Sequence, residues 1–354
     1  MGAVTARDEW AYDFNSNDLR EKVVEFMNVY EAEKVRWRKA GKPKKISDFV
    51  DRRIKWTSEL ETHLQRDTLL EFEESRITLS LYRPFVSMPT YFAGPFTHRT
   101  YQLPALFPES AKRNPCITFL SISSSWLLTT LATDRVFDYC LLKQGNGGTQ
   151  ALPLYIFDES GHRTDNITDW GVKQFEKRYG KRAKLSRERI FAYVYAVLHN
   201  PAYREKYALN LKRELPRVPL YDGFAQWADW GEKLMALHIG FESAGIYPLT
   251  RTDVAGSENP KCKLKADKDA GRIVVDEATT LSGVPEAAWD YKLGNRSALE
   301  WVLDQYKESA PRDPTIREHF NTYRFADYKE RVIELLCRVC TVSVETQKII
   351  HLMP

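Results

Sequence analysis

The sequence has few cysteines, no long apolar run and no strong excess of charge of one sign. Five cysteines scattered over 354 residues are too few for a disulfide framework, which indicates a reducing compartment. No segment approaches the roughly 20 apolar residues of a membrane span, and the first residues lack the apolar core of a signal peptide. We therefore expect a soluble, cytoplasmic protein with no membrane partner.

Internal repeats, low-complexity tracts and catalytic motifs are also missing. Residues 273–277 (IVVDE) mimic a magnesium-binding strand of helicase ATPases, but no Gly-x-x-x-x-Gly-Lys-[Ser/Thr] phosphate loop accompanies them. Cys337 and Cys340 have the spacing of half a zinc site without a second Cys/His pair. The seven histidines are dispersed, with no nucleophile nearby. We expect no catalytic, cofactor-binding or metal site in this chain.

Positive charge is concentrated in one stretch. Residues 34–56 contain ten Lys/Arg against two Asp/Glu, whereas the whole chain has a net charge of only +4. Two interpretations stay open: a solvated helix face, or a surface that contacts a polyanion. A second basic stretch, residues 173–189, carries the same two interpretations.

Hydrophobic periodicity predicts an α+β fold. After Asn15, apolar residues recur at helical spacing up to the break at residues 41–43, and residues 77–81 then alternate as a strand. Residues 76–157 stay strand-like, whereas residues 167–241 have a helical period. We thus expect a strand-rich N-terminal half with a leading helix, followed by a helical module.

The C-terminal part predicts a hairpin followed by helices. Residues 262–266 and 272–275 alternate on either side of a turn, and lysines on the first strand suit an exposed edge. Ser297 and Glu300 form a capping-box pattern, and a last helix follows near residues 332–339. The predicted divisions are a leading helical segment (1–60), a strand-rich part (61–165), a helical module (166–250) and a hairpin with C-terminal helices (251–354).

Several segments are too particular in residue order to be generic helix or strand sequence. They are residues 80–85 (SLYRPF), 101–104 (YQLP), 190–204 (IFAYVYAVLHNPAYR), 281–306 (LSGVPEAAWDYKLGNRSALEWVLDQY) and 342–346 (VSVET). On these segments the chain resembles the C-terminal specificity region of type ISP restriction-modification enzymes. In that family a nuclease, a helicase-like ATPase, an adenine methyltransferase and a target-recognition domain follow one another in a single polypeptide.

The resemblance implies a fragment that recognises a DNA sequence for chemistry housed elsewhere, with residues 1–60 as a helical coupling segment and residues 61–165 as the target-recognition part. It implies double-stranded DNA and the upstream methyltransferase and helicase domains as partners. S-adenosylmethionine, ATP and Mg would serve the parent enzyme, an adenine-specific methyltransferase with ATP-dependent restriction, and none would bind this fragment. Two alternatives stay open: a structural coupling module with only nonspecific DNA contacts, and a degenerate S-adenosylmethionine-dependent methyltransferase.

The methyltransferase alternative depends on residues 200–203 (NPAY), which are similar to the Asn-Pro-Pro-Tyr loop that holds a flipped base. The start of a helix explains the same four residues, because Asn is favoured as an N-cap and Pro is favoured at the first helical position, here Asn200 and Pro201. We favour the helix interpretation, since no glycine-rich cofactor loop occurs upstream.

Candidate DNA contacts follow from the chemistry of duplex recognition. Phosphates attract Lys and Arg, guanine favours Arg or Lys, and adenine favours Asn or Gln. For Arg83, one of these candidates, a structural ion pair is the alternative to a base contact. The candidates are the phosphate contacts Lys44, Lys45, Arg52 and Arg53, and the base contacts Arg83, Gln102, Lys143, Gln144 and Asn146.

Overall fold

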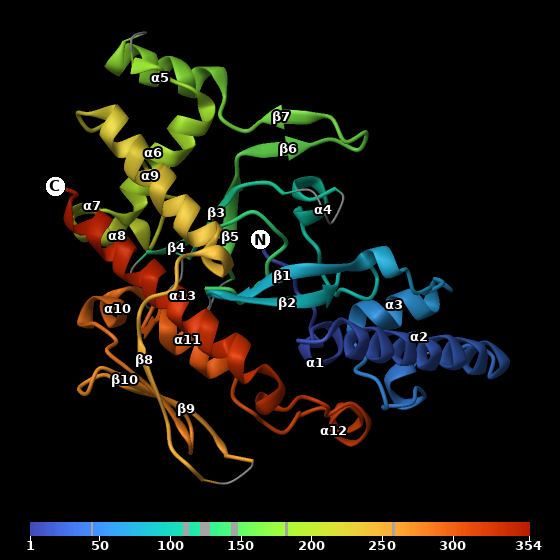
Figure 1. Ribbon diagram of the computed structural model, residues 1–354. Helices are drawn as coiled ribbons and strands as arrows, with labels where there is room; N and C mark the ends of the chain where they lie inside the picture. Colours follow the sequence, from blue (N-terminus) through green and yellow to red (C-terminus); the bar gives the residue numbers. More distant parts are fainter. Residues whose placement is uncertain (44, 109–112, 121–127, 143–147, 181–182, 257–258) are drawn as a thin grey trace.

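A computed structural model describes residues 1–43, 45–108, 113–120, 128–142, 148–180, 183–256 and 259–354. Helices and strands are mixed along the chain, so the α+β class is confirmed (Figure 1). The helices are α1 (Asp8–Ala11), α2 (Ser16–Lys39), η1 (Ile46–Asp48), α3 (Ser58–Gln65), η2 (Glu74–Arg76), α4 (Leu103–Leu106), α5 (Asp169–Tyr179), α6 (Arg187–His199), α7 (Pro201–Lys206), α8 (Ala208–Leu211), α9 (Phe224–Ile239), η4 (Phe241–Ser243), α10 (Glu286–Asp290), α11 (Ala298–Gln305), α12 (Pro314–His319) and α13 (Phe325–His351).

The strands form several small antiparallel sheets. The pairs are β1–β2, β6–β7 and β12–β13; a three-stranded sheet has the order β4-β3-β5, and a four-stranded sheet has the order β8-β11-β10-β9. The strands are β1 (Ile77–Arg83), β2 (Val86–Tyr91), β3 (Cys116–Leu120), β4 (Thr129–Thr133), β5 (Gln150–Pro153), β6 (Tyr155–Phe157), β7 (Arg163–Asp165), β8 (Thr250–Asp253), β9 (Cys262–Asp267), β10 (Arg272–Asp276), β11 (Thr279–Ser282), β12 (Lys292–Leu293) and β13 (Arg296–Ser297).

The leading helix α2 begins at a capping residue and ends just before a glycine, as its sequence predicts. The Asn15 side chain accepts hydrogen bonds from the backbone N–H groups of Asn17 and Asp18 and so caps the first turn. Leu19, at the start of the apolar stripe, is fully buried. Beyond Ala40 the chain turns through Gly41 at a φ of +77°, a conformation that favours glycine. The predicted helix and its predicted end are confirmed.

The predicted C-terminal hairpin is confirmed and belongs to a larger sheet. Strands β9 and β10 pair with Arg272 opposite Asp267, but β8 and β11 extend the sheet on the far side of β10. Strand β9 therefore lies at an edge, where Lys263 pairs with Glu277. The Ser297–Glu300 capping box is present at α11.

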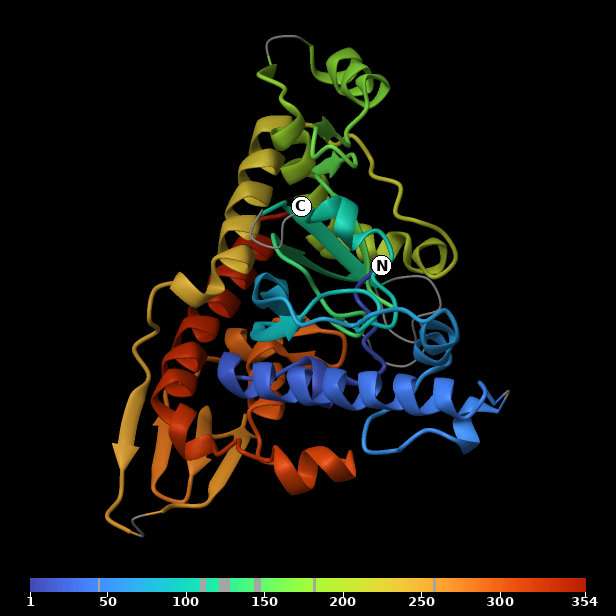
Figure 2. The ribbon, with the colours of Figure 1, turned by 90° about the vertical axis from the view of Figure 1, so that its right-hand side faces the viewer.

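Helices α6 and α9 pack against each other at very short range. A Cβ atom on Gly231 of α9 would lie 1.8 Å from the carbonyl oxygen of Ala192 on α6, so only glycine allows this approach. Most side chains of α6 are buried, Phe191 and Tyr195 among them, so this helix is covered on more than one face. Figure 2 shows α9 and α13 following one another along one side of the molecule.

The hydrophobic cores run across the four predicted divisions. One core joins residues of α1 and α2 with β1, β2, α11 and α13. The other joins Ile117, Phe119 and Ala132 of the three-stranded sheet with α6 and α9. Hence the leading helix shares a core with the C-terminal helices, and the strand-rich part packs on the helical module. Among the described helices, none combines the length and apolar character that a membrane crossing requires.

A buried histidine ties the helices together. His238 of α9 makes a short hydrogen bond, 2.5 Å, to the Tyr195 hydroxyl through Nδ1, and its Nε2 lies 2.9 Å from Thr346 Oγ1 and 3.1 Å from the Tyr291 hydroxyl. Burial, helped by the charge of Arg204, lowers the pKa of His238 to about 3. The imidazole is therefore neutral in the folded protein at neutral pH.

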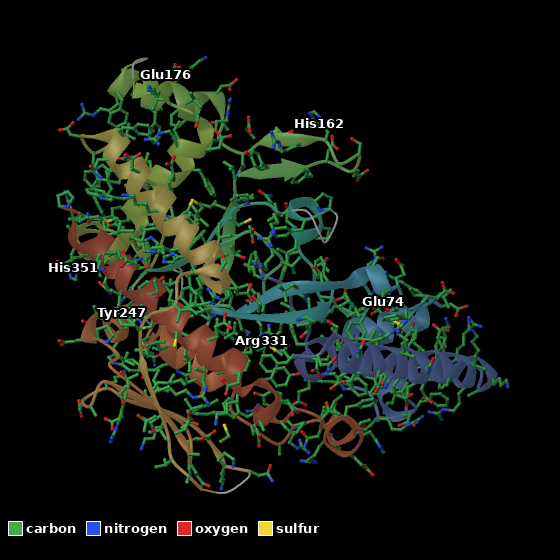
Figure 3. The ribbon with its side chains drawn as sticks, viewed as in Figure 1. Glu74, His162, Glu176, Tyr247, Arg331 and His351 are labelled. Atoms are coloured by element: carbon green, nitrogen blue, oxygen red, sulfur yellow. The ribbon has the colours of Figure 1, made fainter. Side chains whose placement is uncertain are left out.

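The depressed pKa predicts acid sensitivity. Because the unfolded chain takes up this proton near pH 6.5 and the folded chain does not, the stabilisation is complete above pH 6.5 and declines as the pH falls toward 3. At pH 5 His238 alone accounts for a decrease of about 2 kcal/mol in unfolding free energy. Urea titrations at pH 7 and pH 5 should show a smaller difference for His238→Gln than for the native chain. His162→Gln, a change at an exposed position on the β6–β7 hairpin (Figure 3), should leave the difference intact.

Candidate nucleic-acid interface

The three-stranded sheet brings two connecting segments to one end. Leu120 of β3 pairs with Thr129 of β4, and Phe119 pairs with Gln150 of β5. Because β4 and β5 both run antiparallel to β3, the connection from β3 to β4 and the segment entering β5 lie at the same end of the sheet. We call this end, marked by Leu120, Thr129 and Gln150, the loop end of the sheet.

The candidate base contacts Lys143, Gln144 and Asn146 precede β5 and lie outside the described residues, as does Lys44. The described residues on either side of positions 143–147 contact the rest of the fold. The backbone N–H of Leu142 donates to Thr149 Oγ1 at 2.9 Å. A Cβ atom on Gly148 would lie 2.0 Å from the Tyr139 ring, so a larger residue at this point would require the ring to move. Leu142 and Gly148, the described residues on either side of positions 143–147, thus lie near the loop end of the sheet.

Gln102 lies on a neighbouring element. It is the exposed residue immediately before α4, and the adjacent Tyr101 stacks on Tyr139 with ring centroids 6.4 Å apart. Tyr139 in turn packs against Gly148. The structure therefore joins Gln102 to Gly148, the described residue that follows positions 143–147, although more than 30 residues separate them in sequence.

Arg83 lies behind this surface and is largely buried. Its Nη1 lies 2.6 Å from Asp138 Oδ1, and its guanidinium stacks over the Tyr82 ring at 3.8 Å. Burial raises the pKa of Asp138 to about 6, against the opposing attraction of Arg83. This geometry supports the structural ion-pair role that was the alternative for Arg83. Its guanidinium contacts Asp138 and Tyr82 within the protein.

Much of the basic stretch 34–56 is neutralised by carboxylates, most of them from outside it. Lys34 pairs with Glu31, Arg36 with Glu33, and Arg38 with Asp67. Arg53 pairs with Asp51 and lies 4.0 Å from Glu25. Lys45 is exposed, with Asp48 only at 3.9 Å, and Arg52 is exposed. Lys45 and Arg52 are consequently the more available of the described phosphate candidates.

The basic stretch and Gln102 belong to different parts of the surface. In Figures 1 and 2 the C-terminal end of α2, where the stretch begins, lies apart from α4. The structure therefore brings Gln102 together with a residue that flanks positions 143–147, and it places Lys45, Arg52 and Arg53 elsewhere. A duplex would have to lie along both regions to use all of these candidates.

A cavity of about 610 Å³ was missed by sequence reasoning. It lies at the loop end of the sheet, where the start of β4 meets α6–α8, the end of α10, β12 and α13. His199, Arg204 and Tyr291 are among the residues that line it. A sequence signal existed, because residues 190–204 and 281–306, which carry the family resemblance, converge on this cavity.

The two segments that resemble catalytic motifs, residues 200–203 and 273–277, have structural roles. Asn200 Oδ1 accepts from the Tyr203 backbone N–H, and Asn200 Nδ2 donates to the Pro354 carbonyl, so the amide caps α7 and holds the chain end. Asp276 pairs with Lys329 at 2.7 Å and accepts two backbone N–H groups. Within the described ranges, no group of three or more Cys, His, Asp and Glu side chains is arranged to hold a metal ion.

Comparisons with known proteins identify the family. The sequence model of the type ISP C-terminal specificity domain matches residues 1–335, and the chain belongs to this family. No curated protein sequence matches the chain significantly. The predicted relationship to type ISP enzymes is confirmed.

Solved structures resemble the chain over its whole length. A cryo-EM structure of a DrdV–DNA complex has 44% sequence identity and a TM-score of 0.92, with 100% of this chain and 35% of that chain covered. A nuclease-deletion mutant of the type ISP enzyme LlaGI, in complex with a DNA substrate mimic, has 27% identity and a TM-score of 0.83, with 100% and 32% covered. DNA-bound LlaBIII shares the fold, with 24% identity, a TM-score of 0.83, and 100% and 23% covered. The chain therefore spans about a third or less of the length of each.

The ion pair of Arg83 predicts a stability effect. Arg83→Met would leave Asp138 buried without its cation, and we expect unfolding free energy to fall by about 3 kcal/mol. Arg53→Met, which breaks exposed pairs, should cost less than about 1 kcal/mol. Chemical denaturation measures both. Equal, small decreases would show that Arg83 is dispensable to the fold and would return it to the base-contact candidates.

Proposed function

We propose that this chain is the DNA target-recognition region of a longer type ISP-like restriction-modification enzyme. It would hold duplex DNA so that an adenine methyltransferase, a helicase and a nuclease elsewhere in the polypeptide act at or from a chosen sequence. The observation that carries this proposal is the match along the whole chain to part of a DrdV–DNA complex, together with family membership.

The geometry supports a division between phosphate and base contacts. Lys45 and Arg52 are long, exposed cations on the surface near α2, suited to phosphates. Gln102 and, by their residue types, Lys143, Gln144 and Asn146 offer amide and amine groups suited to base edges. The Tyr101–Tyr139 stack joins Gln102 to Gly148, the described residue that follows positions 143–147.

The chemistry of the parent enzyme would lie outside this chain. Methylation of an adenine would use S-adenosylmethionine, and translocation would use ATP and Mg, each bound by other domains. All five cysteines are free thiols, which suits action on DNA in a reducing cytoplasm. The chain itself would contribute positioning and selectivity.

Phosphate binding predicts a change in salt dependence. Replacing Lys45 and Arg52 with Gln should lower the slope of log affinity against log salt by about 0.9 for each phosphate that is no longer neutralised. Sequence preference should stay the same, because phosphates carry no base identity. Fluorescence anisotropy with short duplexes between low and physiological salt measures both quantities. Arg213→Gln, an exposed change outside the basic stretch, is the matched control. An unaltered slope would remove Lys45 and Arg52 from the interface.

Base recognition predicts altered selectivity. Replacing Lys143, Gln144 and Asn146 together with Ala should reduce the discrimination between the preferred duplex and mismatched ones by about 1–3 kcal/mol for each base that these side chains read. Competition binding with a library of duplexes, repeated with the methyltransferase attached, measures the preference. A structural coupling module with only nonspecific contacts would show the same preference before and after substitution, and that result would replace the recognition proposal.

A further inference from the structure

The second basic stretch, residues 173–189, is only partly neutralised in the folded chain. Lys181 and Arg182 lie outside the described residues. Lys173 and Lys177, both on α5, are exposed and make no ion pair within the described part of the chain. Three arginines of the stretch do pair with carboxylates: Arg178 with Asp222, Arg187 with Asp165 and Asp169, and Arg189 with Asp229 and Glu232. Helix α5 therefore carries two cations that these internal ion pairs do not use.

Lys173, Lys177 and Trp170 share one side of α5. Successive residues of an α-helix are rotated by about 100°, so these three side chains lie within a sector of about 60°. The opposite side is buried, and there the Phe175 ring packs edge-to-face against Phe224. This packing turns Trp170 and both lysines toward solvent. We call the side that carries these three residues the outer face of α5.

Trp170 is unusually exposed for a tryptophan. Its side chain is 72% exposed, whereas tryptophans are highly buried on average and are enriched where proteins contact partners. The acidic residues of α5 leave the outer face positive. Asp169 is paired with Arg187, and Glu176, labelled in Figure 3, is rotated by about 120° from Trp170. An aromatic ring beside two unpaired lysines suits a partner with negative charge.

Hydrogen bonds join the neighbourhood of Gln102 to the β6–β7 hairpin. Gln102 directly precedes α4, and Leu106 is the last residue of that helix. Asn114 Nδ2 donates to the Leu106 carbonyl at 3.1 Å and to the Tyr155 carbonyl of β6 at 2.8 Å. One amide group thus connects α4 with the hairpin.

A single arginine then connects the hairpin with α5. Arg187, at the start of α6, lies 3.6 Å from Asp165 of β7 and also pairs with Asp169, the first residue of α5. In Figures 1 and 2 the β6–β7 hairpin lies between α4 and α5. The outer face of α5 is therefore held in a defined position beyond the elements that carry Gln102.

The chemistry of the outer face favours the phosphate backbone of a duplex. A lysine is a compact charge without a directional fork, which suits phosphate, and the indole N–H of Trp170 is a donor for a phosphate oxygen. A duplex that Gln102 contacts continues on either side as an unbroken line of phosphates. Contacts to phosphate and sugar make up half or more of the hydrogen bonds between proteins and DNA.

We propose that the outer face of α5 is a second phosphate-binding surface, which holds the duplex outside the bases that are read. The inference rests on the proposed DNA recognition and adds a contact on a different element from Lys45 and Arg52. Because phosphates carry no base identity, this contact lengthens the bound DNA without changing the recognised sequence.

The first experiment compares two duplexes that share the preferred sequence. The long duplex continues for about one helical turn beyond this sequence on each side, and the short duplex ends with it. Replacing Lys173 and Lys177 with Gln should make the slope of log affinity against log salt shallower by about 0.9 for each phosphate released from the long duplex. The slope on the short duplex should stay the same, because the flanking phosphates are absent. Fluorescence anisotropy measures both slopes.

A matched variant controls for net charge. Replacing Lys212 and Arg213 with Gln removes the same charge from exposed positions after α8, and it should leave both slopes unchanged. If this control lowers the slope as much as the α5 variant does, net charge explains the effect and the proposal is wrong. A native slope for the α5 variant on the long duplex, or equal decreases on the two duplexes, would also overturn it.

The second experiment observes Trp170 directly. The chain has nine tryptophans, so the Trp170 signal in ¹⁹F spectra of a 5-fluorotryptophan-labelled chain is assigned by its loss in Trp170→Phe. The long duplex should shift this signal, and the short duplex should leave it in place. A signal that stays in place with the long duplex contradicts the contact. A shift on attachment of the methyltransferase, before DNA is added, would show that α5 binds a neighbouring domain and would replace the proposal.

The two proposals fail in different ways. If the α5 variant behaves as the native chain does while the native chain still prefers one sequence, the α5 contact is wrong and target recognition stands. If the native chain binds all duplexes equally but the α5 variant has the shallower slope on long DNA, target recognition is wrong and the phosphate contact stands.

Discussion

The ion pair between Arg83 and Asp138 is the interaction on which the candidate interface depends. Asp138 accepts from Arg83, from the Tyr12 hydroxyl at 3.2 Å and from the Cys140 backbone N–H, and its own N–H donates to the Leu81 carbonyl. One carboxylate therefore joins the end of α1, β1 and the turn that precedes segment 143–147. Tyr139 follows it directly and carries both the Tyr101 stack and the Gly148 contact. Because an unpaired buried charge is costly, this arrangement holds the turn in a single position.

The sequence predicts those parts of the fold that local chemistry determines. Helix α2, the β9–β10 hairpin and the Ser297 capping box form as expected, because caps, turns and apolar periods act over a few residues. Strand β4 lies within residues 76–157, which were predicted as strand-like, but no separate strand was predicted at Thr129–Thr133, since this segment is buried by α9 and has no alternating pattern of its own. Residues 136–142 have a strand-like sequence, yet they form a turn with isolated bridges to Ala3 and Leu81.

Charge and function were harder to predict, because their partners are distant in sequence. The excess of ten cations over two acids in residues 34–56 indicated a polyanion surface, but Glu31, Glu33 and Asp67 neutralise part of it in three dimensions. Arg83 suited a base contact and an ion pair alike; only the position of Asp138, 55 residues away, distinguishes the two. The composition of a segment shows which charged side chains it contains, whereas the folded structure determines which of them are free of ion pairs with other parts of the chain.

The same limit applies to the cavity beside His199. Tyr195, His238, Tyr291 and Thr346 form a closed hydrogen-bonded group in which each side chain satisfies another, and His199 lies against it with one nitrogen unsatisfied by any described residue. The members of this group come from α6, α9, α13 and the residue after α10, so no period along a single helix shows which side chains find a hydrogen-bond partner.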